Sequence, residues 1–427
     1  MSDVTDSEPI WTPAPIPAAA SVLTEAGYLP WMSSSLARRG VESAAQAESF
    51  LAPSISDLTE PQQLDNLSRA VERLCRARSA DEKVAIVGDY DVDGISATAI
   101  LLAVFRRCGI EAAAILPNRF ETGYGFQPAH VEDAADQGCG LIVTADCGSS
   151  ATAALAAARE LDLDVIVTDH HLSSDRLPEW VIEINPKQQE EGDACRDLAG
   201  SGVALKLAVA LLRELEIPVR FDSLLRIACL GTICDLVPLQ GENRVIVSLG
   251  LKALAETRSR GLRALIDRAG VRPPFRAPDI GFRIGPRINA AGRLADPAPA
   301  LELLMTRDQA VANSISARLE ELNRQRQVEE SHVVEEAVDR FADVSELPPI
   351  LVAWDESWHR GVVGIAAGHL SRKFHRPAIL MAIEDGLATG SGRSIPGIHL
   401  HAFLEEWAEE LVRFGGHAQA IGLTLAE

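Results

Sequence analysis

Five short apolar runs, mostly separated by alanine-rich stretches, restrict how this chain can fold more than any other feature. The runs are "VAIVGD" (84–89), "EAAAILP" (111–117), "GLIVTAD" (140–146), "DVIVTD" (164–169) and "VIEINP" (181–186). A strand that is apolar at nearly every position has no face for water and needs helices on both sides. The pattern therefore predicts an α/β fold with a five-stranded parallel sheet covered by helices.

The rest of the sequence divides into further units, because 427 residues exceed what one core normally holds. Residues 298–342 read as long helices with a charged face, and a second α/β pattern begins near residue 349. We expect an N-terminal leader with helices, a sheet domain, a helical connector and a smaller α/β domain. The expected boundaries are 1–65, 66–250, 251–345 and 346–427.

Polar side chains follow four of the five runs, at the point where each expected strand ends. The carboxyl ends of parallel strands lie at one edge of a sheet, where ligands bind, so we expect these side chains to meet in one crevice. They are Asp89, Asp91 and Asp93 after the first strand, Asn118 and Arg119 after the second, Asp146 after the third, and Asp169, His170 and His171 after the fourth.

Three aspartates at alternate positions, 89, 91 and 93, would repel one another unless a cation lay between them. One aspartate after a strand is more often a helix N-cap, and a lone histidine pair carries little information. Asp235 lies inside the apolar stretch "GTICDLVPL", where an acid is normally either paired or a ligand. Carboxylates combined with imidazole suit Mn²⁺ or Mg²⁺, so the convergence predicts a site for two such ions.

Composition limits the binding partners and the cellular compartment less strictly than the strand pattern limits the fold. The net charge of −21 taken alone argues against a nucleic-acid partner, yet residues 251–330 hold 14 Lys and Arg against 10 Asp and Glu. No run of about eighteen uncharged apolar residues is present, so no membrane partner is expected. The seven cysteines are odd in number and form no C-x-x-C pair, and the N-terminus lacks a basic, apolar signal segment. These features predict a cytoplasmic protein.

Several motifs, taken in order over roughly residues 35–427, resemble a known family. "GDYDVDG", "PNRFETGYGF", "TADCGSS" and "VTDHHL" are similar to the leading motifs of the DHH-superfamily phosphoesterases. "LAGSGVALKL", "LGTICDLVPLQGENR" and "GFRIGPRINAAGRLADP" resemble the bacterial RecJ single-stranded-DNA exonucleases in that superfamily, and "WHRGVVGIAAGHL", "GSGRS" and "FGGHAQAIG" resemble their DHHA1 domain. The resemblance implies a DHH catalytic domain, a connector with an arginine-rich loop, and a DHHA1 domain with a mixed sheet.

The resemblance also implies an activity: a 5′→3′ exonuclease for single-stranded DNA in repair and recombination, which releases 5′-mononucleotides by two-metal hydrolysis. It implies that Asp146 bridges the ions, that Asp169 orients the neighbouring histidines, and that His171 faces the scissile phosphate. The metal ligands that it implies are Asp89, Asp91, Asp93, Asp146, His170 and Asp235.

Substrate contacts are expected on the other side of the cleft, where glycines beside polar side chains let a phosphate approach, although such a segment is often a plain solvated turn. The DNA-binding residues implied are Asn118, Arg119, Arg287, Asn289, Arg293, Ser391, Arg393, Gly415, Gly416 and His417. RecJ proteins usually continue past the last motif, so we expect an incomplete DHHA1 domain and no OB-fold.

Two other functions stay open at this point. A DHH-family phosphodiesterase for short oligonucleotides, cyclic dinucleotides or pyrophosphate would use the same metal ligands. A non-catalytic replication scaffold, like the eukaryotic relative Cdc45, would keep the fold and lose metal ligands, whereas all of them are present here. The length of the helical segment and the insertion "PNRFETGYGF" favour a polymeric substrate.

Overall fold

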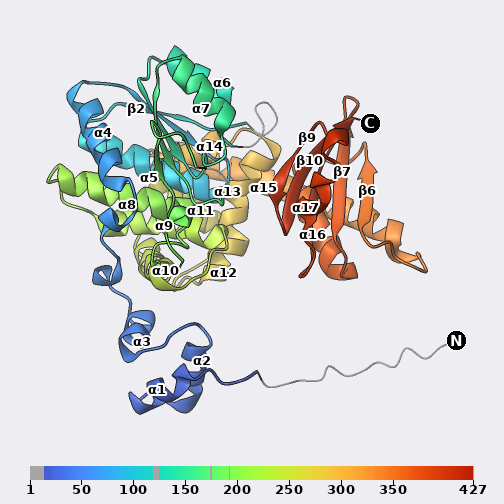
Figure 1. The fold of residues 1–427 in the computed structure, drawn as a ribbon, viewed down its shortest axis with the longest axis horizontal. Helices are drawn as coiled ribbons and strands as arrows, with labels where there is room; N and C mark the ends of the chain where they lie inside the picture. Colours follow the sequence, from blue (N-terminus) through green and yellow to red (C-terminus); the bar gives the residue numbers. More distant parts are fainter. Residues whose placement is uncertain (1–13, 119–124, 174–175, 192, 427) are drawn as a thin grey trace.

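The computed structural model describes residues 14–118, 125–173, 176–191 and 193–426. Two sheets form the centres of two bodies, and one long helix joins them (Figure 1). Sheet A has the strand order β2-β1-β3-β4-β5, and every neighbouring pair is parallel. Its strands are β1 (Val84–Gly88), β2 (Ala112–Ile115), β3 (Leu141–Ala145), β4 (Asp164–Thr168) and β5 (Ile182–Ile184). The predicted five-stranded parallel sheet is confirmed.

Helices cover both faces of sheet A, as its apolar strands require. Along β1, Ile86 points into a large core shared with α4, α5 and α8, whereas Val87 points into a smaller core shared with α6 and α7. The bounds of these helices are α4 (Leu67–Ser79), α5 (Val92–Cys108), α6 (Pro128–Asp136), α7 (Thr152–Glu160) and α8 (Gly200–Glu214).

The strand order reverses between β1 and β3. Helix α5 leads from β1 to β2 over one face, and α6 leads from β2 to β3 over the other. In such sheets the diverging connections leave a crevice at the carboxyl edge, at this switch point. The register pairs Gly88 with Ala145, so the residues that follow, Asp89 and Asp146, leave the sheet side by side at the crevice.

A layer of helices follows the sheet, and its first member packs against α5 and α8. The helices are α9 (Phe221–Cys234), α10 (Gly241–Ala255), α11 (Arg260–Ala269), α12 (Ala277–Asp279), α13 (Gly285–Leu294) and α14 (Ala298–Met305). A π-helical turn, Ile280–Ile284, connects α12 to α13.

The prediction of an arginine-rich loop in "GPRINAAGR" is wrong, because this segment forms α13 with Pro286 in its first turn. Its glycines serve close packing rather than a turn. A Cβ at Gly292 would lie 2.7 Å from the carbonyl oxygen of Tyr90, and one at Gly285 would collide with Sγ of Cys234. Helix α13 therefore lies directly against segments that carry the expected metal ligands.

Sheet B forms the second body, with the order β6-β7-β8-β10-β9, in which only β6 and β7 are parallel. Helices α15 and α16 pack on one face and α17 on the other. The long connecting helix and the mixed sheet are confirmed. The bounds are α15 (Gln309–Ala342), β6 (Leu351–Asp355), α16 (Val363–Phe374), β7 (Ala378–Glu384), β8 (Leu387–Arg393), α17 (Leu400–Glu405), β9 (Arg413–His417) and β10 (Ala420–Ala426).

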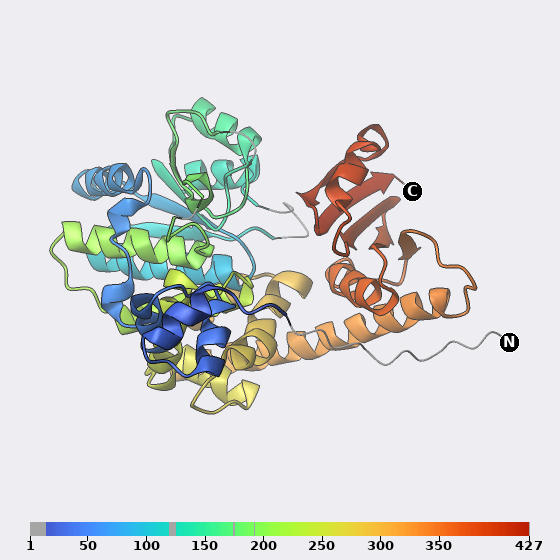
Figure 2. The same cartoon turned by 60° about the horizontal axis from the view of Figure 1, so that its bottom comes forward.

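Helix α15 runs along both bodies, and sheet B stands opposite the body of sheet A (Figure 2). The glycines of "GSGRS" and "FGGHA" were predicted to form flexible turns, and that prediction is wrong because both segments lie mainly in strands, β8 and β9. Backbone pairing with β7 and β10 accounts for the difference.

Three N-terminal helices form a small core of their own, set apart from both sheets in Figure 1. They are α1 (Ala19–Glu25), α2 (Pro30–Ala37) and α3 (Ala44–Leu51). Among the described residues, no helix combines the length and the apolar character that crossing a bilayer requires.

Candidate metal centre

The strand ends of sheet A deliver their carboxylates to one edge because the backbone ladder continues one residue beyond each strand. The amide of Asp89 donates to the carbonyl of Ala145 at 3.2 Å, and the amide of Asp146 donates to the carbonyl of Thr168 at 2.9 Å. Asp146 then turns away from the sheet with a φ of 68°, in the left-handed region that aspartate tolerates better than most residues. The crevice is thus lined by acids that are almost fully buried.

The first turn of α5 fixes the other two aspartates of the triplet. Asp91 is the N-cap, and its Oδ1 accepts hydrogen bonds from the amides of Asp93 and Gly94 at 2.9 and 3.0 Å. Asp93 accepts from the amides of Gly200 and Ser201, at the N-terminus of α8, at 2.6 and 3.0 Å. Asp91 therefore caps α5 through Oδ1, and its second carboxylate oxygen remains available as a metal ligand.

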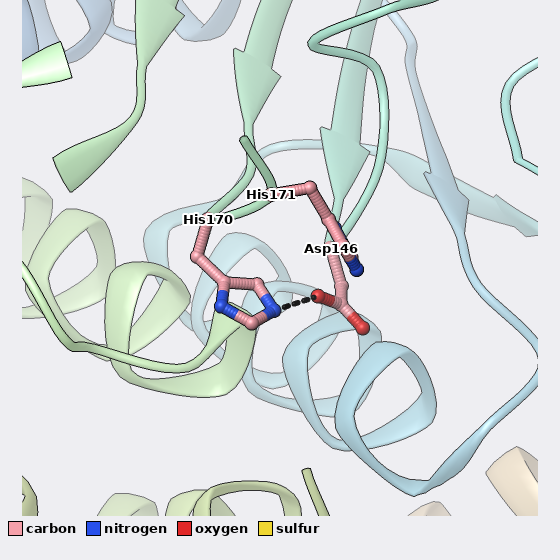
Figure 3. Close-up of side chains that lie close together, drawn as sticks. All are labelled: Asp146, His170 and His171. Carbon is pink, nitrogen blue, oxygen red and sulfur yellow. Dashed lines mark ion pairs between the residues drawn. The ribbon is translucent and has the colours of Figure 1, made fainter. Parts of the chain in front are cut away.

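His170 lies at the centre of these carboxylates. Its Nε2 is 3.1 Å from Oδ1 of Asp146, 3.5 Å from Oδ2 of Asp235 and 3.8 Å from Oδ2 of Asp93. Figure 3 shows the His170 ring turned toward Asp146, from the adjacent strand end. Asp235 reaches the cluster from the C-cap of α9, far from the other ligands in sequence.

The donor atoms fall into overlapping groups of three, and within each group they lie within 4.8 Å of one another. Two of these groups share no residue, and the contact between His170 and Asp146 links them. The groups are Asp93 with His170 and Asp235, Asp89 with Asp91 and Asp146, and Asp146 with His170 and His171. Two adjacent three-donor groups joined by one carboxylate match the arrangement expected for two ions.

Repulsion among the buried carboxylates of the cluster favours the binding of cations. Burial, together with repulsion from Asp91, raises the pKa of Asp89 to about 8. Burial and repulsion from Asp93 likewise raise the pKa of Asp235 to about 8, and the pKa of Asp146 lies well above its ordinary range. Divalent ions would remove this repulsion.

Two buried atoms support the fit directly. Within the described part of the chain, neither Oδ1 of Asp146 nor Nε2 of His170 makes a hydrogen bond, although both are fully buried. Burial lowers the pKa of His170 and so favours the neutral imidazole, which is the form that binds metals. Unsatisfied buried atoms are costly unless they have a partner, so this set of oxygen donors with one imidazole fits Mn²⁺ or Mg²⁺.

Asp169 does not contact the cluster as a ligand but holds the histidine turn. Its Oδ1 accepts from the amides of His170 and His171 and lies 2.8 Å from Nδ1 of His171. Burial acts to raise the pKa of Asp169, yet the hydrogen bonds from His171 and Ser149 hold it well below its ordinary value. Burial opposes the charge on His171, but Asp169 prevails and raises its pKa to about 9. His171 is therefore a cation at neutral pH.

Sequence reasoning missed the residues that brace this turn from β5. The side-chain amide of Asn185 donates to Oγ of Ser149 at 2.8 Å and to the carbonyl of His171 at 2.9 Å. Ser149 donates its backbone amide to Oδ2 of Asp169 at 2.9 Å. The only signal in the sequence was the position of Asn185 at the end of the fifth strand.

Replacing Asn185 with alanine should lower kcat about 10- to 100-fold with little change in KM, because it frees the turn that carries His170 and His171. Steady-state kinetics on the substrate that the family resemblance implies, single-stranded DNA, measures both constants. Asn66→Ala is the matched control: its amide donates at 2.9 Å to the carbonyl of Glu183 on the same strand, away from the histidines. Equal losses in both variants would assign Asn185 a purely structural role.

The arginines of α13 have partners within the chain. Nε of Arg287 lies 2.5 Å from a carboxylate oxygen of Glu320 on α15, so this guanidinium ties α13 to the connecting helix. Nη1 of Arg293 donates to the carbonyl of Gly361, in the second body, at 3.4 Å. Asn289 accepts at 3.0 Å from the amide of Val92, between two expected ligands. Of the three, Arg293 contacts the second body, and the DNA contacts expected of all three stay predictions.

Most of the other expected contacts lie on sheet B. Burial, together with the charges of Arg393 and His171, lowers the pKa of His417. Ser391 and Arg393 lie against the N-terminus of α16, where a Cβ at Gly364 would be 3.1 Å from Oγ of Ser391. The remaining positions are Gly415 and Gly416 on the edge strand β9, Asn118 just after β2, and Arg119, which lies outside the described residues.

Comparisons with known proteins agree with this geometry. Residues 83–232 match the model of the DHH family, N-terminal domain, and residues 347–427 match the DHHA1 domain. A parallel sheet with an acidic switch point, followed by a DHHA1 domain, defines the class: a metal-dependent DHH phosphoesterase.

Proteins of similar sequence indicate a family within this class. The single-stranded-DNA-specific exonuclease RecJ of Bacillus subtilis (strain 168) is 38% identical over 94% of this chain and 51% of its own length. RecJ of Salmonella typhimurium is 38% identical over 92% of this chain and 71% of its own length. The chain belongs to the RecJ family. It spans about half the length of the Bacillus relative.

Solved structures of RecJ from Thermus thermophilus also match. The structure in complex with Mn²⁺ has a TM-score of 0.81 and 30% identity, over 95% of this chain and 58% of that one. The structure in complex with Mg²⁺ has a TM-score of 0.76 and 28% identity, over 96% of this chain and 56% of that one. Both ions agree with the donor set described above.

Proposed function

We propose that this chain is a 5′→3′ exonuclease for single-stranded DNA, which hydrolyses phosphodiester bonds in DNA repair and recombination and releases 5′-mononucleotides. One observation carries the proposal. Donors that follow β1, β3, β4 and α9 form two linked three-donor groups at the switch point of sheet A. Membership of the RecJ family supports the choice of substrate.

The proposed metal ligands are Asp89, Asp91, Asp93, Asp146, His170 and Asp235. A pair of divalent ions bound there would supply the positive charge that activates water and stabilises the attacking and leaving oxygens. The protein's part is to hold these ligands in place through the hydrogen bonds of α5, α8 and the strand ends.

His171 has a separate role in this proposal. Its side chain is 43% exposed, whereas Asp169 behind it is buried, so the imidazolium reaches the open side of the crevice. Held in its charged form by Asp169, it donates a hydrogen bond to an oxygen of the scissile phosphate. It therefore stabilises negative charge without being a metal ligand.

Replacing Arg393 with alanine should raise KM for single-stranded DNA about tenfold and lower the slope of log KM against log salt concentration by about 1, because one phosphate contact is lost. Steady-state kinetics at low and at physiological salt measures both. Arg413→Ala is the control, since the exposed Arg413 on β9 pairs with Thr424 of β10, whereas Arg393 pairs with Ala420 near the other end of that strand. An unchanged slope would remove Arg393 from the DNA interface.

The proposal as a whole is tested by incubating the chain with four substrates, in Mn²⁺ and in EDTA: 5′-labelled single-stranded DNA, the same sequence as duplex, a dinucleotide and pyrophosphate. We expect labelled 5′-mononucleotide from the single strand in Mn²⁺ only. Faster turnover of the dinucleotide or pyrophosphate would favour a small-substrate phosphodiesterase. No hydrolysis of any substrate would favour the scaffold.

A further inference from the structure

The three most exposed large apolar side chains in the described part of the chain all lie in segments next to the metal centre. They are Leu236, Phe282 and Leu172, with exposed fractions of 83%, 80% and 75%. Single exposed apolar side chains are normal on any protein surface. The coincidence of these three with one functional centre needs a cause, and we call the set the apolar rim.

Two members of the apolar rim are chain neighbours of expected metal ligands. Leu236 directly follows Asp235, and Leu172 is two residues beyond His170. Oδ2 of Asp235 and Nε2 of His170 are 3.5 Å apart, and consecutive Cα atoms are only about 3.8 Å apart. Both leucines therefore emerge from the border of the metal centre. Because they are exposed, they face the solvent there rather than the buried carboxylates.

The backbone of Leu236 adds a second observation. Its φ of 62° is in the left-handed region, which leucine rarely adopts. Residues held in this region store strain, and such strain is concentrated at functional sites. The side chain of Leu236 is exposed, so burial within this chain does not compensate for the strained backbone conformation. A ligand that covers the side chain would provide the missing stabilisation.

Phe282 lies on the π-helical turn Ile280–Ile284, which neighbours one of the elements that carry the expected ligands. A Cβ at Gly281 would lie 3.7 Å from Cγ2 of Ile233, and one at Gly285 would collide with Cys234, so the turn packs on the end of α9 that carries Asp235. Ile280 and Ile284 are buried at either end of the turn, whereas Phe282 is exposed. Turns of this kind are frequent at functional sites.

We infer that the apolar rim contacts unpaired bases of the DNA strand whose phosphate lies at the metal centre. This inference rests on the proposed function for the position of the phosphate. A phosphodiester bound at the metal ions places the neighbouring nucleosides at the border of the centre. The apolar rim can then contact the bases of these nucleosides. Unpaired bases offer apolar faces, and stacking on aromatic side chains binds them without regard to sequence. Bases in a duplex are already stacked, so the apolar rim favours single strands.

The test compares binding of two fluorescein-labelled 12-mers in Mn²⁺ by fluorescence anisotropy: oligo-dT and a chain of abasic sites, both phosphorothioate-linked so that they resist hydrolysis. For oligo-dT, Phe282→Ala should raise Kd about 5- to 50-fold, and Leu236→Ala or Leu172→Ala about 2- to 10-fold. For the abasic chain, the three variants should bind like the unaltered protein, within about twofold. Because all three side chains are exposed, thermal unfolding should be unchanged.

Leu161→Ala is the matched control. Leu161 is also exposed, at 47%, but it follows α7 at the opposite edge of sheet A, near the start of β4. It should change neither Kd. Equal losses on both 12-mers, or no loss on oligo-dT, would overturn the inference, and the second result would leave the apolar rim to a protein partner.

The outcomes separate this inference from the proposed function. Hydrolysis of bis(p-nitrophenyl) phosphate by the unaltered chain reports on the metal centre without any base. The chain could hydrolyse neither this ester nor DNA and still show base-dependent binding that the three substitutions remove. That result would uphold the role of the apolar rim and overturn the proposed nuclease activity. If the chain hydrolyses DNA but none of the three substitutions changes its affinity for oligo-dT, the nuclease would be upheld and the role of the apolar rim overturned.

Discussion

Asp146→Ala should reduce hydrolysis of single-stranded DNA by at least about a thousandfold, because the substitution removes the carboxylate that links the two donor groups. Asp146 is within reach of Asp89 and Asp91 on one side and of His170 on the other. Single-turnover hydrolysis in saturating Mn²⁺ measures the loss.

Asp146→Asn, which removes the charge but keeps a side chain that tolerates the left-handed backbone, should leave the metal-free fold as stable as before or make it more stable. Burial raises the pKa of Asp146, and repulsion from Asp93 and Asp91 adds to this effect, so the carboxylate contributes nothing favourable when no cation is bound. Thermal unfolding in EDTA tests this part. Asp164→Ala is the control: it removes an aspartate at the opposite edge of the sheet that pairs with Arg73 at 2.6 Å, so it should lower stability and spare activity. Activity retained in Asp146→Ala would exclude the proposed centre.

Much of this site was predictable because β-strands place residues at their ends with little freedom. The runs that end at Gly88, Ala145 and Thr168 are apolar at nearly every position, so they had to lie inside a parallel sheet, and their next residues had to meet at one edge. That reasoning required no knowledge of the helices. It did not extend to Asp235, which comes from the end of α9 and was assigned as a ligand partly through the family resemblance.

Glycine was the residue that sequence reasoning misread. In "GPRINAAGR", "GSGRS" and "FGGHA" it was taken as a sign of turns, but glycine also allows two backbones to approach closely. At Gly292 the reason is the carbonyl of Tyr90, and at Gly390 it is the carbonyl of Leu380, which a Cβ would approach to 2.6 Å. Both neighbours are distant in sequence, so no local pattern distinguishes the two uses.

Tertiary contacts also explain the residues that were missed. Asn185 and Ser149 are unremarkable polar residues in the sequence, and they become important only because β5 lies beside β4 and the Ser149 loop reaches Asp169. The position of sheet B opposite the body of sheet A likewise depends on how α15 joins them (Figure 2). Strand order and helix length decide both arrangements, and neither can be derived from a motif.

Metal-free protein should lose stability steadily as the pH rises from about 4 to about 8, the reverse of the usual behaviour of buried carboxyl groups in ion pairs. Burial and neighbouring acids raise the pKa of Asp89 and of Asp235 to about 8, from an ordinary value of 3.8. A carboxyl group whose pKa is higher in the folded state binds more protons there than in the unfolded state between these two values, so the free energy of unfolding decreases with pH. Each tenfold change in proton affinity is worth about 1.4 kcal/mol per group, so the decrease in the free energy of unfolding is large enough to measure.

His171 extends this window upward. Its pKa of about 9 in the folded chain exceeds the ordinary value of 6.5, so the stability that it contributes with Asp169 is complete below pH 6.5 and is lost as the pH rises through 9. The pKa of Asp169 is lowered instead, so its contribution is lost only in acid, below the ordinary value of 3.8. Neither group offsets the loss from Asp89 and Asp235 between pH 4 and 8.

Divalent ions should cancel the effect, because they replace the protons that the folded cluster otherwise holds. Thermal unfolding at pH 5, 6, 7 and 8, in EDTA and in 1 mM Mn²⁺, should therefore show a stabilisation by Mn²⁺ that grows with pH and exceeds several degrees at pH 8. In Asp146→Ala the increment should shrink at every pH, whereas in Asp164→Ala it should match that of the unaltered chain. An increment independent of pH would contradict the proposed centre, since metal binding to carboxyl groups of raised pKa is coupled to proton release over this range.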